Sequence, residues 1–261
     1  MPTLGIVPYL NAVPLVADLE AEATLVALVP SELSHELEAG RVDAALIPVA
    51  EAIRGVGDGY LGRFGITSDG PVMSVLLFLR RPLCDVRSVV LDPASRASAG
   101  MARHLVREAA GREVTFDLAD VPGPDPREEE GDAVLLIGDP AMAYRELWPD
   151  EIVDLGALWK ERVALPFVYA RWTARRGLAE GQRAQIQALL DTAGASGLLR
   201  RESLARSWAA ARGVNPDEAA RYVLEHVRYE IGPREEAGLR RYAEILEAER
   251  ADEARRGRRH A

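Results

Sequence analysis

MPTLGIVPYLNAVP, residues 1–14, is the stretch that decides how this chain folds. Residues 3–7 are apolar, which is typical of a short buried strand, and the periodicity of residues 12–19 predicts a helix. A helix that begins directly after a strand presents free backbone N–H groups at its start, and these groups favour an anion. Tyr9 and Asn11 add a hydroxyl and an amide at this turn. Alternatively, Asn11 serves only as the N-cap of the helix.

The same order of strand, polar turn and helix returns along the first 150 residues. Predicted strands alternate with predicted helices, and Gly40 and Gly111 follow two of those helices as C′ residues. This alternation indicates an α/β fold with parallel strands and right-handed crossovers. The glycine-rich residues 55–65 are expected to be irregular. The predicted strands cover residues 25–29, 42–48, 86–91, 114–118 and 133–137.

Two long apolar runs, residues 72–79 and 165–172, divide the chain. We expect one lobe to contain residues 1–78 and 171–261, and the second lobe to contain residues 79–170. Two crossings between lobes predict a hinge with a cleft. After residue 172 the pattern becomes helical, with helices expected over residues 178–193, 201–212, 216–227 and 233–256.

Polar turns follow several predicted strands, and the carboxyl ends of the strands should bring them to the cleft. Two serines and an arginine at one helix start suit a carboxylate. Three alternatives stay open at this point. Arg96 can form a surface salt bridge, Asp139 can cap a helix, and Ser74 can be hydrogen-bonded in the core rather than face the cleft. The candidate residues are Tyr9, Asn11, Ser68, Ser74, Ser95, Arg96, Ser98, Gly138 and Asp139.

Composition excludes several classes of function. The chain has 261 residues, 48% of them hydrophobic, and a net charge of −9, which argues against a broad nucleic-acid surface. No apolar run approaches the roughly 20 residues that a membrane span needs. Met1 leads directly into a strand pattern without a basic or apolar leader, so we expect a cytoplasmic protein. A single cysteine, Cys84, and four scattered histidines predict no metal site.

Six stretches of the chain carry a family resemblance: GIVPYLNAVP (5–14), VDAALIP (42–48), SDGPVMSV (68–75), LDPASRAS (91–98), LIGD (136–139) and the segment 154–167 with its DLG, Trp159 and LPF. In this collinear order they resemble the chorismate dehydratase family, and the resemblance spans residues 3–245. Ala97 stands where the family usually has threonine, and Val163-Ala164 stands where it often has Thr-Gly. The first departure removes one hydroxyl from the second lobe's anion site.

The resemblance implies a two-lobed fold like that of type II periplasmic binding proteins. It also implies that chorismate loses water to give 3-[(1-carboxyvinyl)oxy]benzoate, in the futalosine route to menaquinone, without metal or organic cofactor. For this reaction we expect Asn11 and Ser74 to hold the ring hydroxyl or the enolpyruvyl group. Ser95, Ser98 and Arg96 are candidates for the ring carboxylate. The base is either the substrate's own enolpyruvyl carboxylate or Asp139.

Three competing functions share this fold. The sister enzyme that makes 1,4-dihydroxy-6-naphthoate has a different opening loop, without Tyr-Leu-Asn, and ranks second. A non-enzymatic binding protein for small carboxylates would normally carry a secretory signal. A cytoplasmic ligand sensor would usually sit beside a DNA-binding module. We therefore expect a small-molecule enzyme, with neither nucleic acid nor membrane as partner.

Overall fold

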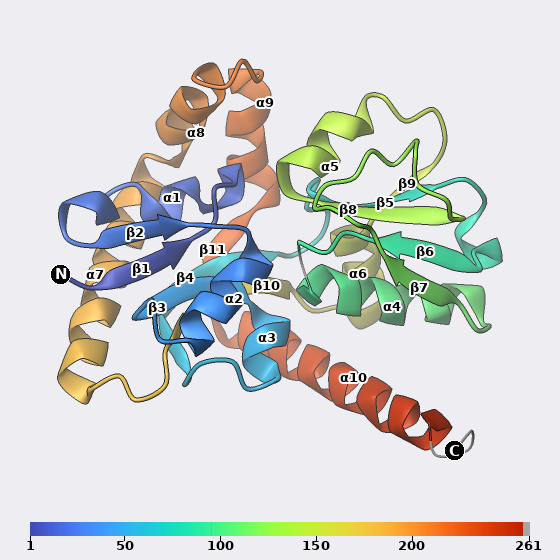
Figure 1. Cartoon of the computed structure of the whole chain (residues 1–261). Helices are drawn as coiled ribbons and strands as arrows, with labels where there is room; N and C mark the ends of the chain where they lie inside the picture. Colours follow the sequence, from blue (N-terminus) through green and yellow to red (C-terminus); the bar gives the residue numbers. More distant parts are fainter. Residues whose placement is uncertain (95, 258–261) are drawn as a thin grey trace.

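The computed structural model describes residues 1–94 and 96–257, and it folds into two α/β lobes that lie side by side (Figure 1). Each lobe is built on one sheet with helices packed against it. Within the described residues, no helix is both long and apolar enough to cross a membrane.

The first lobe contains a mixed sheet of six strands in the order β11-β4-β10-β3-β1-β2. The β1 strand pairs in parallel with β2 and β3, whereas β10 runs antiparallel to β3 and β4. Gly5 in β1 leaves no room for a side chain, because a Cβ there would lie 2.8 Å from Ala45 Cβ and Leu33 Cδ2. The strands are β1 (Thr3–Ile6), β2 (Thr24–Ala27), β3 (Ala44–Pro48), β4 (Tyr60–Ser68), β10 (Phe167–Ala174) and β11 (Arg228–Glu230).

The helices of this lobe come from both ends of the chain. A 3₁₀ turn at Leu10–Ala12 leads into α1, and a π-helical turn at Tyr222–His226 follows α9. The helices are α1 (Val13–Val16), α2 (Pro30–Glu38), α3 (Val49–Ile53), α7 (Glu180–Leu199), α8 (Arg201–Ala210), α9 (Pro216–Arg221) and α10 (Pro233–Gly257).

The second lobe contains a five-stranded sheet in the order β7-β6-β8-β5-β9. The β6 strand is parallel to β7 and β8, and β5 is antiparallel to β8 and β9. Its strands are β5 (Val75–Leu79), β6 (Ser88–Leu91), β7 (Thr115–Leu118), β8 (Ala133–Ile137) and β9 (Ile152–Asp154). Its helices are α4 (Arg96–Ala110), α5 (Gly138–Arg145) and α6 (Leu155–Val163).

The sheets shift both expected lobe boundaries. Residues 75–78 were assigned to the first lobe, but β5 pairs with β8 in the second. Residues 167–170 were assigned to the second lobe, but β10 lies inside the first sheet. The crossings are therefore residues 69–74 and 164–166. Each of the two apolar runs contains a buried central strand, β5 or β10. A continuous apolar run predicts a buried strand, but it does not predict which sheet the strand joins.

Two further expectations were wrong. The glycine-rich segment 55–65 is not irregular throughout, because β4 begins at Tyr60. Gly65 permits close contact between β4 and β10, since a Cβ there would lie 2.6 Å from Ala170 O. The helix expected over residues 216–227 is interrupted by the π-helical turn, and the short edge strand β11 follows it.

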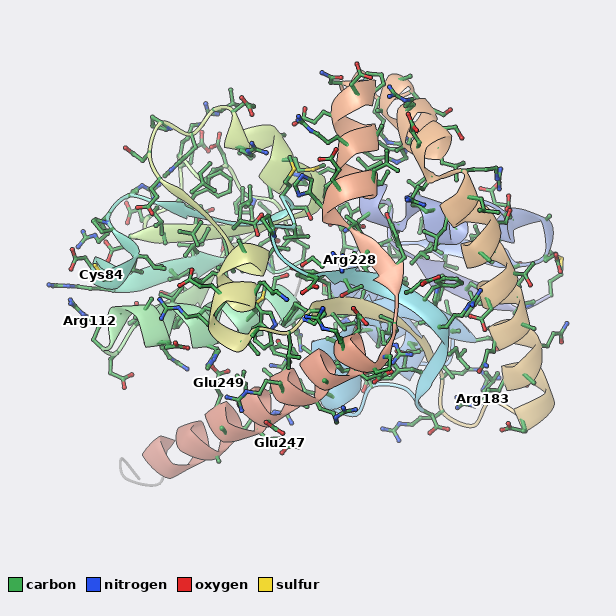
Figure 2. All side chains as sticks on the ribbon, turned by 180° about the vertical axis from the view of Figure 1, so that it is seen from behind. Cys84, Arg112, Arg183, Arg228, Glu247 and Glu249 are labelled. Carbon is green, nitrogen blue, oxygen red and sulfur yellow. The ribbon has the colours of Figure 1, made fainter. Side chains whose placement is uncertain are left out.

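The long helix α10 holds the two lobes together from behind. It begins beside β11 and crosses under both lobes, with Glu247 and Glu249 on its outer half (Figure 2). Tyr242 donates a hydrogen bond from its hydroxyl to Ala97 O in α4 at 2.8 Å. The same ring packs edge-to-face against Trp159 and Phe167, with centroids 6.1 and 4.9 Å away. Aromatic side chains from both lobes and from α10 therefore pack together where the lobes meet.

Candidate active site

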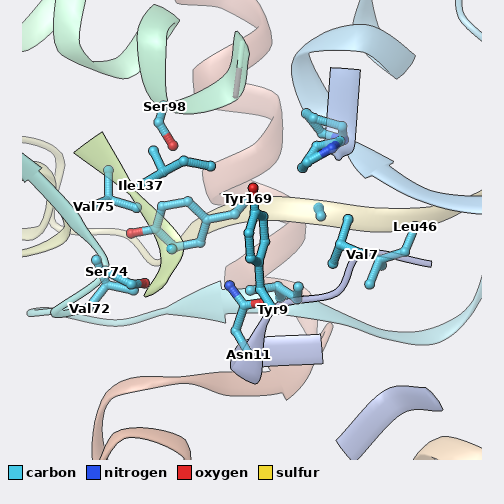
Figure 3. Close-up of a pocket in the computed structure, with 15 residues that line it drawn as sticks. Val7, Tyr9, Asn11, Leu46, Val72, Ser74, Val75, Ser98, Ile137 and Tyr169 are labelled. Atoms are coloured by element: carbon cyan, nitrogen blue, oxygen red, sulfur yellow. The ribbon is translucent and has the colours of Figure 1, made fainter. Parts of the chain in front are cut away.

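A pocket lies between the lobes, where polar turns of both sheets meet (Figure 3). It has an empty volume of about 510 Å³, counting open space at its mouth. Fifteen described residues line it and each is uncharged, and nine of them are apolar, for example Val7, Leu46 and Ile137. The remaining six are Tyr9, Asn11, Ser74, Ser98, Gly138 and Tyr169.

The turn after β1 supplies two of these residues, as the sequence predicts. Figure 3 shows the Tyr9 ring standing near the centre of the pocket, with Asn11 at its base. Burial raises the pKa of Tyr9 to about 12, and the carboxylates of Asp92 and Asp139 add to the rise. Tyr9 is therefore a neutral hydroxyl donor at ordinary pH. Asn11 Oδ1 is buried and has no hydrogen-bond partner among the described residues, so it can accept from a ligand.

Ser74 faces this pocket from the crossing between β4 and β5, and its side chain is fixed by a residue that sequence reasoning missed. Tyr222 donates a hydrogen bond from its hydroxyl to Ser74 Oγ at 2.7 Å. The Ser74 carbonyl accepts from Gly138 N, also at 2.7 Å. Both open alternatives for Ser74 therefore hold, because its hydroxyl is hydrogen-bonded in the core and also borders the pocket.

Ser68 does not line the pocket but lies behind a residue that does. Its Oγ is 3.0 Å from the hydroxyl of Tyr169, which is the residue that reaches the lining. Burial raises the pKa of Tyr169 well above its ordinary value, so this phenol also stays neutral. Tyr169 lies in the apolar run 165–172, where an aromatic hydroxyl flanked by Val168 and Ala170 was the available signal.

The first turn of α4 brings Ser98 into the pocket, and the Ser98 hydroxyl points inward from the helix (Figure 3). Ser95 lies outside the described residues. Arg96 does not line the pocket. Its Nε lies 3.3 Å from Glu51 Oε1 of α3, so the pair joins the two lobes. About half of the Arg96 side chain is exposed, which matches the salt-bridge alternative.

Gly138 and Asp139 begin α5 at the edge of the pocket. Gly138 lines it with φ +65°, a left-handed conformation that suits glycine, and a Cβ there would touch the Tyr9 ring at 3.5 Å. Asp139 stands behind the lining, where its Oδ1 accepts from Leu10 N at 3.4 Å across the lobes. Burial raises the pKa of Asp139 to about 6, although the Leu10 hydrogen bond and Arg212 oppose this rise.

The pocket can hold an anion without a charged partner. The helices α4 and α5 both begin at it, and the first turn of a helix presents N–H groups and a partial positive charge. Gly138 N at the start of α5 already donates to Ser74 O. Among the described residues, no group of three or more His, Cys, Asp or Glu side chains is placed to hold a metal ion. The arrangement suits a small molecule that carries carboxylates and a hydroxyl.

Solved structures of the same fold cover nearly the whole chain. Protein AF1704 from Archaeoglobus fulgidus matches 95% of this chain and 97% of its own, with a TM-score of 0.76 and 17% identity. The periplasmic aliphatic sulphonate binding protein SsuA from Escherichia coli matches 96% of this chain and 92% of its own, with a TM-score of 0.66 and 17% identity. The predicted two-lobed fold of the periplasmic-binding-protein type is confirmed.

Sequence comparisons agree with the resemblance found in the motifs. The chorismate dehydratase of Thermus thermophilus is 32% identical over 93% of this chain and 94% of its own length. The chorismate dehydratase of Campylobacter jejuni is 24% identical over 92% of this chain and 91% of its own. A family model described as menaquinone biosynthesis matches residues 2–248. The chain therefore belongs to this menaquinone biosynthesis family.

Proposed function

We propose that this chain is a chorismate dehydratase, a hydro-lyase that converts chorismate to 3-[(1-carboxyvinyl)oxy]benzoate and water. Its place would be the futalosine route to menaquinone, in the cytoplasm, and it would use no metal or organic cofactor. The observation that carries the proposal is the interlobe pocket, where uncharged donors from both lobes surround a space bordered by helix starts. The two chorismate dehydratases to which the chain is similar support the same substrate.

The chemistry of chorismate sets the demands on the pocket. The C3 proton beside the ether oxygen must leave first, and its electron pair delocalises through the diene into the ring carboxylate. The C4–O bond then breaks, hydroxide leaves with that bond's electrons, and a proton converts it to water. Aromatisation makes the elimination downhill. Donors fixed at the ring carboxylate therefore stabilise the transition state more than the bound substrate.

The pocket residues fit these demands. Ser98 and the backbone N–H groups at the starts of α4 and α5 would hold the ring carboxylate. Asn11 Oδ1 would accept from the C4 hydroxyl, because this buried oxygen has no partner among the described residues. Ser74 would donate to the departing oxygen, since its own acceptor side is already used by Tyr222. Tyr9 would shield the ring from water at the centre of the pocket.

The substrate's enolpyruvyl carboxylate is the base that the geometry favours. Among the described residues that line the pocket, none is a carboxylate, a histidine or a lysine. Asp139, the rival, stands behind Gly138 and Leu10, and its Oδ1 accepts a backbone hydrogen bond. A carboxylate held against the C3 proton by the bound conformation gains its efficiency from proximity.

The test is direct. Purified protein is mixed with chorismate, loss of the diene absorbance and gain of an aromatic absorbance are followed, and the product is identified by mass spectrometry. Ser74→Ala should lower kcat by roughly 100-fold, the usual loss of one fixed donor. Asn11→Ala removes the acceptor for the C4 hydroxyl and should also lower kcat sharply. Ser34→Ala is the matched control, because its equally buried hydroxyl bonds to Pro30 O inside α2.

The outcomes separate the functions. A wild-type protein that binds chorismate and leaves it intact would be a binding protein of this fold, and the proposed activity would fail. Near-normal turnover in both alanine variants would remove Asn11 and Ser74 from the chemistry, although the activity itself would stand. A loss in Ser34→Ala as large as in Ser74→Ala would show that turnover reports on packing alone.

A further inference from the structure

Tyr222 is a buried tyrosine outside the pocket lining, and its hydroxyl is hydrogen-bonded to the lining residues Ser74 and Asn11. Its side chain is 1% exposed, Ser74 is 2% exposed, and the Tyr222 hydroxyl donates to Ser74 Oγ at 2.7 Å. The two residues are 148 positions apart in the chain. We infer that Tyr222 is a positioning residue, which sets the direction of the Ser74 hydroxyl so that Ser74 donates its proton into the pocket.

The direction of this hydrogen bond, from Tyr222 to Ser74, determines what the Ser74 proton can do. A serine hydroxyl has one proton and two lone pairs, so accepting from Tyr222 leaves its proton for another partner. Burial raises the pKa of Tyr222 far above its ordinary value, while hydrogen bonding to Ser74 and Asn11 lowers it less. Tyr222 therefore remains protonated and can donate, which is the role it has in its hydrogen bond to Ser74. Without it, the Ser74 hydroxyl can rotate and donate elsewhere.

A π-helical turn places Tyr222 where it is needed. The turn covers Tyr222–His226, and Val227 N donates to Tyr222 O at 3.2 Å, which is the i to i+5 bond of a π-helix. From the same turn, His226 Nδ1 lies 3.3 Å from Pro71 O. The turn thus contacts the crossing 69–74 at two points, Pro71 and Ser74. Such π-helical turns are often found at functional sites.

The residue before Ser74 is held in a strained conformation. Met73 has φ +62°, a left-handed conformation that is unfavourable in a residue other than glycine. Asp154 at the start of α6 holds it there, because its carboxylate accepts from Met73 N at 2.7 Å and from Val72 N at 3.0 Å. Backbone strain that several contacts enforce is typical of functional positions. Ser74 is therefore oriented on both sides, by Asp154 through the backbone and by Tyr222 through its hydroxyl.

A double-mutant cycle tests this role, which rests on the proposed dehydration of chorismate. Tyr222→Phe should lower kcat about 10-fold and leave KM within about 2-fold of the wild-type value. Substrate binding is kept, but the Ser74 hydroxyl is no longer held in the direction in which it donates to the substrate. On the Ser74→Ala background, Tyr222→Phe should lower kcat by less than about 2-fold. Residues that act through one another lose less together than the product of their separate losses.

Tyr229→Phe is the matched control. Tyr229 is also buried and close in the chain, but its hydroxyl has no hydrogen-bond partner among the described residues. Removing it should leave kcat and KM unchanged. Thermal melts of all variants verify that the fold is kept. A purely structural role for Tyr222 would lower kcat by the same factor with and without the Ser74 hydroxyl.

Each outcome decides the inference. A coupled cycle, in which Tyr222→Phe lowers kcat only in proteins that have Ser74, supports it. Equal losses on both backgrounds, or normal turnover in Tyr222→Phe, overturn it while the wild-type rate keeps the proposed function intact. A wild-type protein that forms no product overturns both together.

Discussion

Replacing Asp139 with asparagine tests the electrostatics of the cleft and the identity of the base in one variant. Asp139 is half-buried at the start of α5, and its Oδ1 accepts from Leu10 N across the lobes at 3.4 Å. Asparagine keeps an acceptor oxygen at this place and removes the charge. Burial raises the pKa of Asp139 to about 6, whereas an aspartate in an unfolded chain has a pKa of about 3.9.

The sign of the effect follows from proton binding. Between pH 4 and pH 6 the folded protein binds more protons at Asp139 than the unfolded chain, so the stability contributed by this group falls as pH rises through the window. Above pH 6 the buried carboxylate destabilises the fold by about 3 kcal/mol, at 1.36 kcal/mol for each of about two pH units. Asp139→Asn should therefore gain about 2 to 3 kcal/mol at pH 8 and almost nothing at pH 4.

Urea unfolding at pH 4, 6 and 8, followed by tryptophan fluorescence, measures this difference. Asp125→Asn is a control in which the change in stability at pH 8 should have the opposite sign. The hydrogen bonds from Arg127 hold the pKa of Asp125 below its ordinary value, so its charge stabilises the fold. An Asp139→Asn protein that is less stable than wild type at pH 8 would refute the reasoning. Turnover by the same variant identifies the base. It should stay within a few-fold of wild type if the substrate carboxylate takes the proton, and fall at least about 100-fold if Asp139 does.

Two further substitutions test the edges of the site. Arg96→Ala should change the free energy of unfolding by less than about 1 kcal/mol, because its pair with Glu51 is half exposed. In the same variant KM should rise about 2-fold to 5-fold at low salt and return toward wild type at high salt, with kcat unchanged; a 100-fold fall in kcat would place Arg96 at the reacting atoms. Gly156→Ala should destabilise by about 1 to 3 kcal/mol, because its Cβ would lie 2.6 Å from Gly70 O and 3.1 Å from Ser68 Oγ. An unchanged Tm in this variant would show that the crossing has room that the structure does not indicate.

Local signals predicted the parts of the site that lie next to strands. The turn with Tyr9 and Asn11 and the first turn of α4 with Ser98 both follow a strand and begin a helix, so sequence alone places their polar groups at a sheet edge. The glycine at 138 follows the same rule. These residues line the pocket because parallel strands bring their carboxyl ends together.

The remaining parts depend on contacts that are distant in sequence. Tyr222 sits in a π-helical turn that the helical periodicity of residues 216–227 conceals, and its partner Ser74 is 148 residues away. Tyr169 lies in a buried strand whose apolarity indicates a core position. The same apolarity concealed which sheet β5 and β10 belong to, since strand partners are set by tertiary pairing.

The crossing 69–74 connects the two lobes and also carries Ser74. Asp154 of the second lobe fixes its Val72 and Met73 amides, Tyr222 of the first lobe fixes the Ser74 hydroxyl, and Gly138 N of the second lobe fixes the Ser74 carbonyl. A change in the angle between the lobes would strain these bonds together, because they join one short segment to both sides. A substrate that bridges Ser98 in one lobe and Asn11 in the other would favour the closed arrangement. Closure would then exclude water and align the Ser74 donor in the same step, and in this way a pocket whose described lining residues are uncharged would assist the loss of hydroxide.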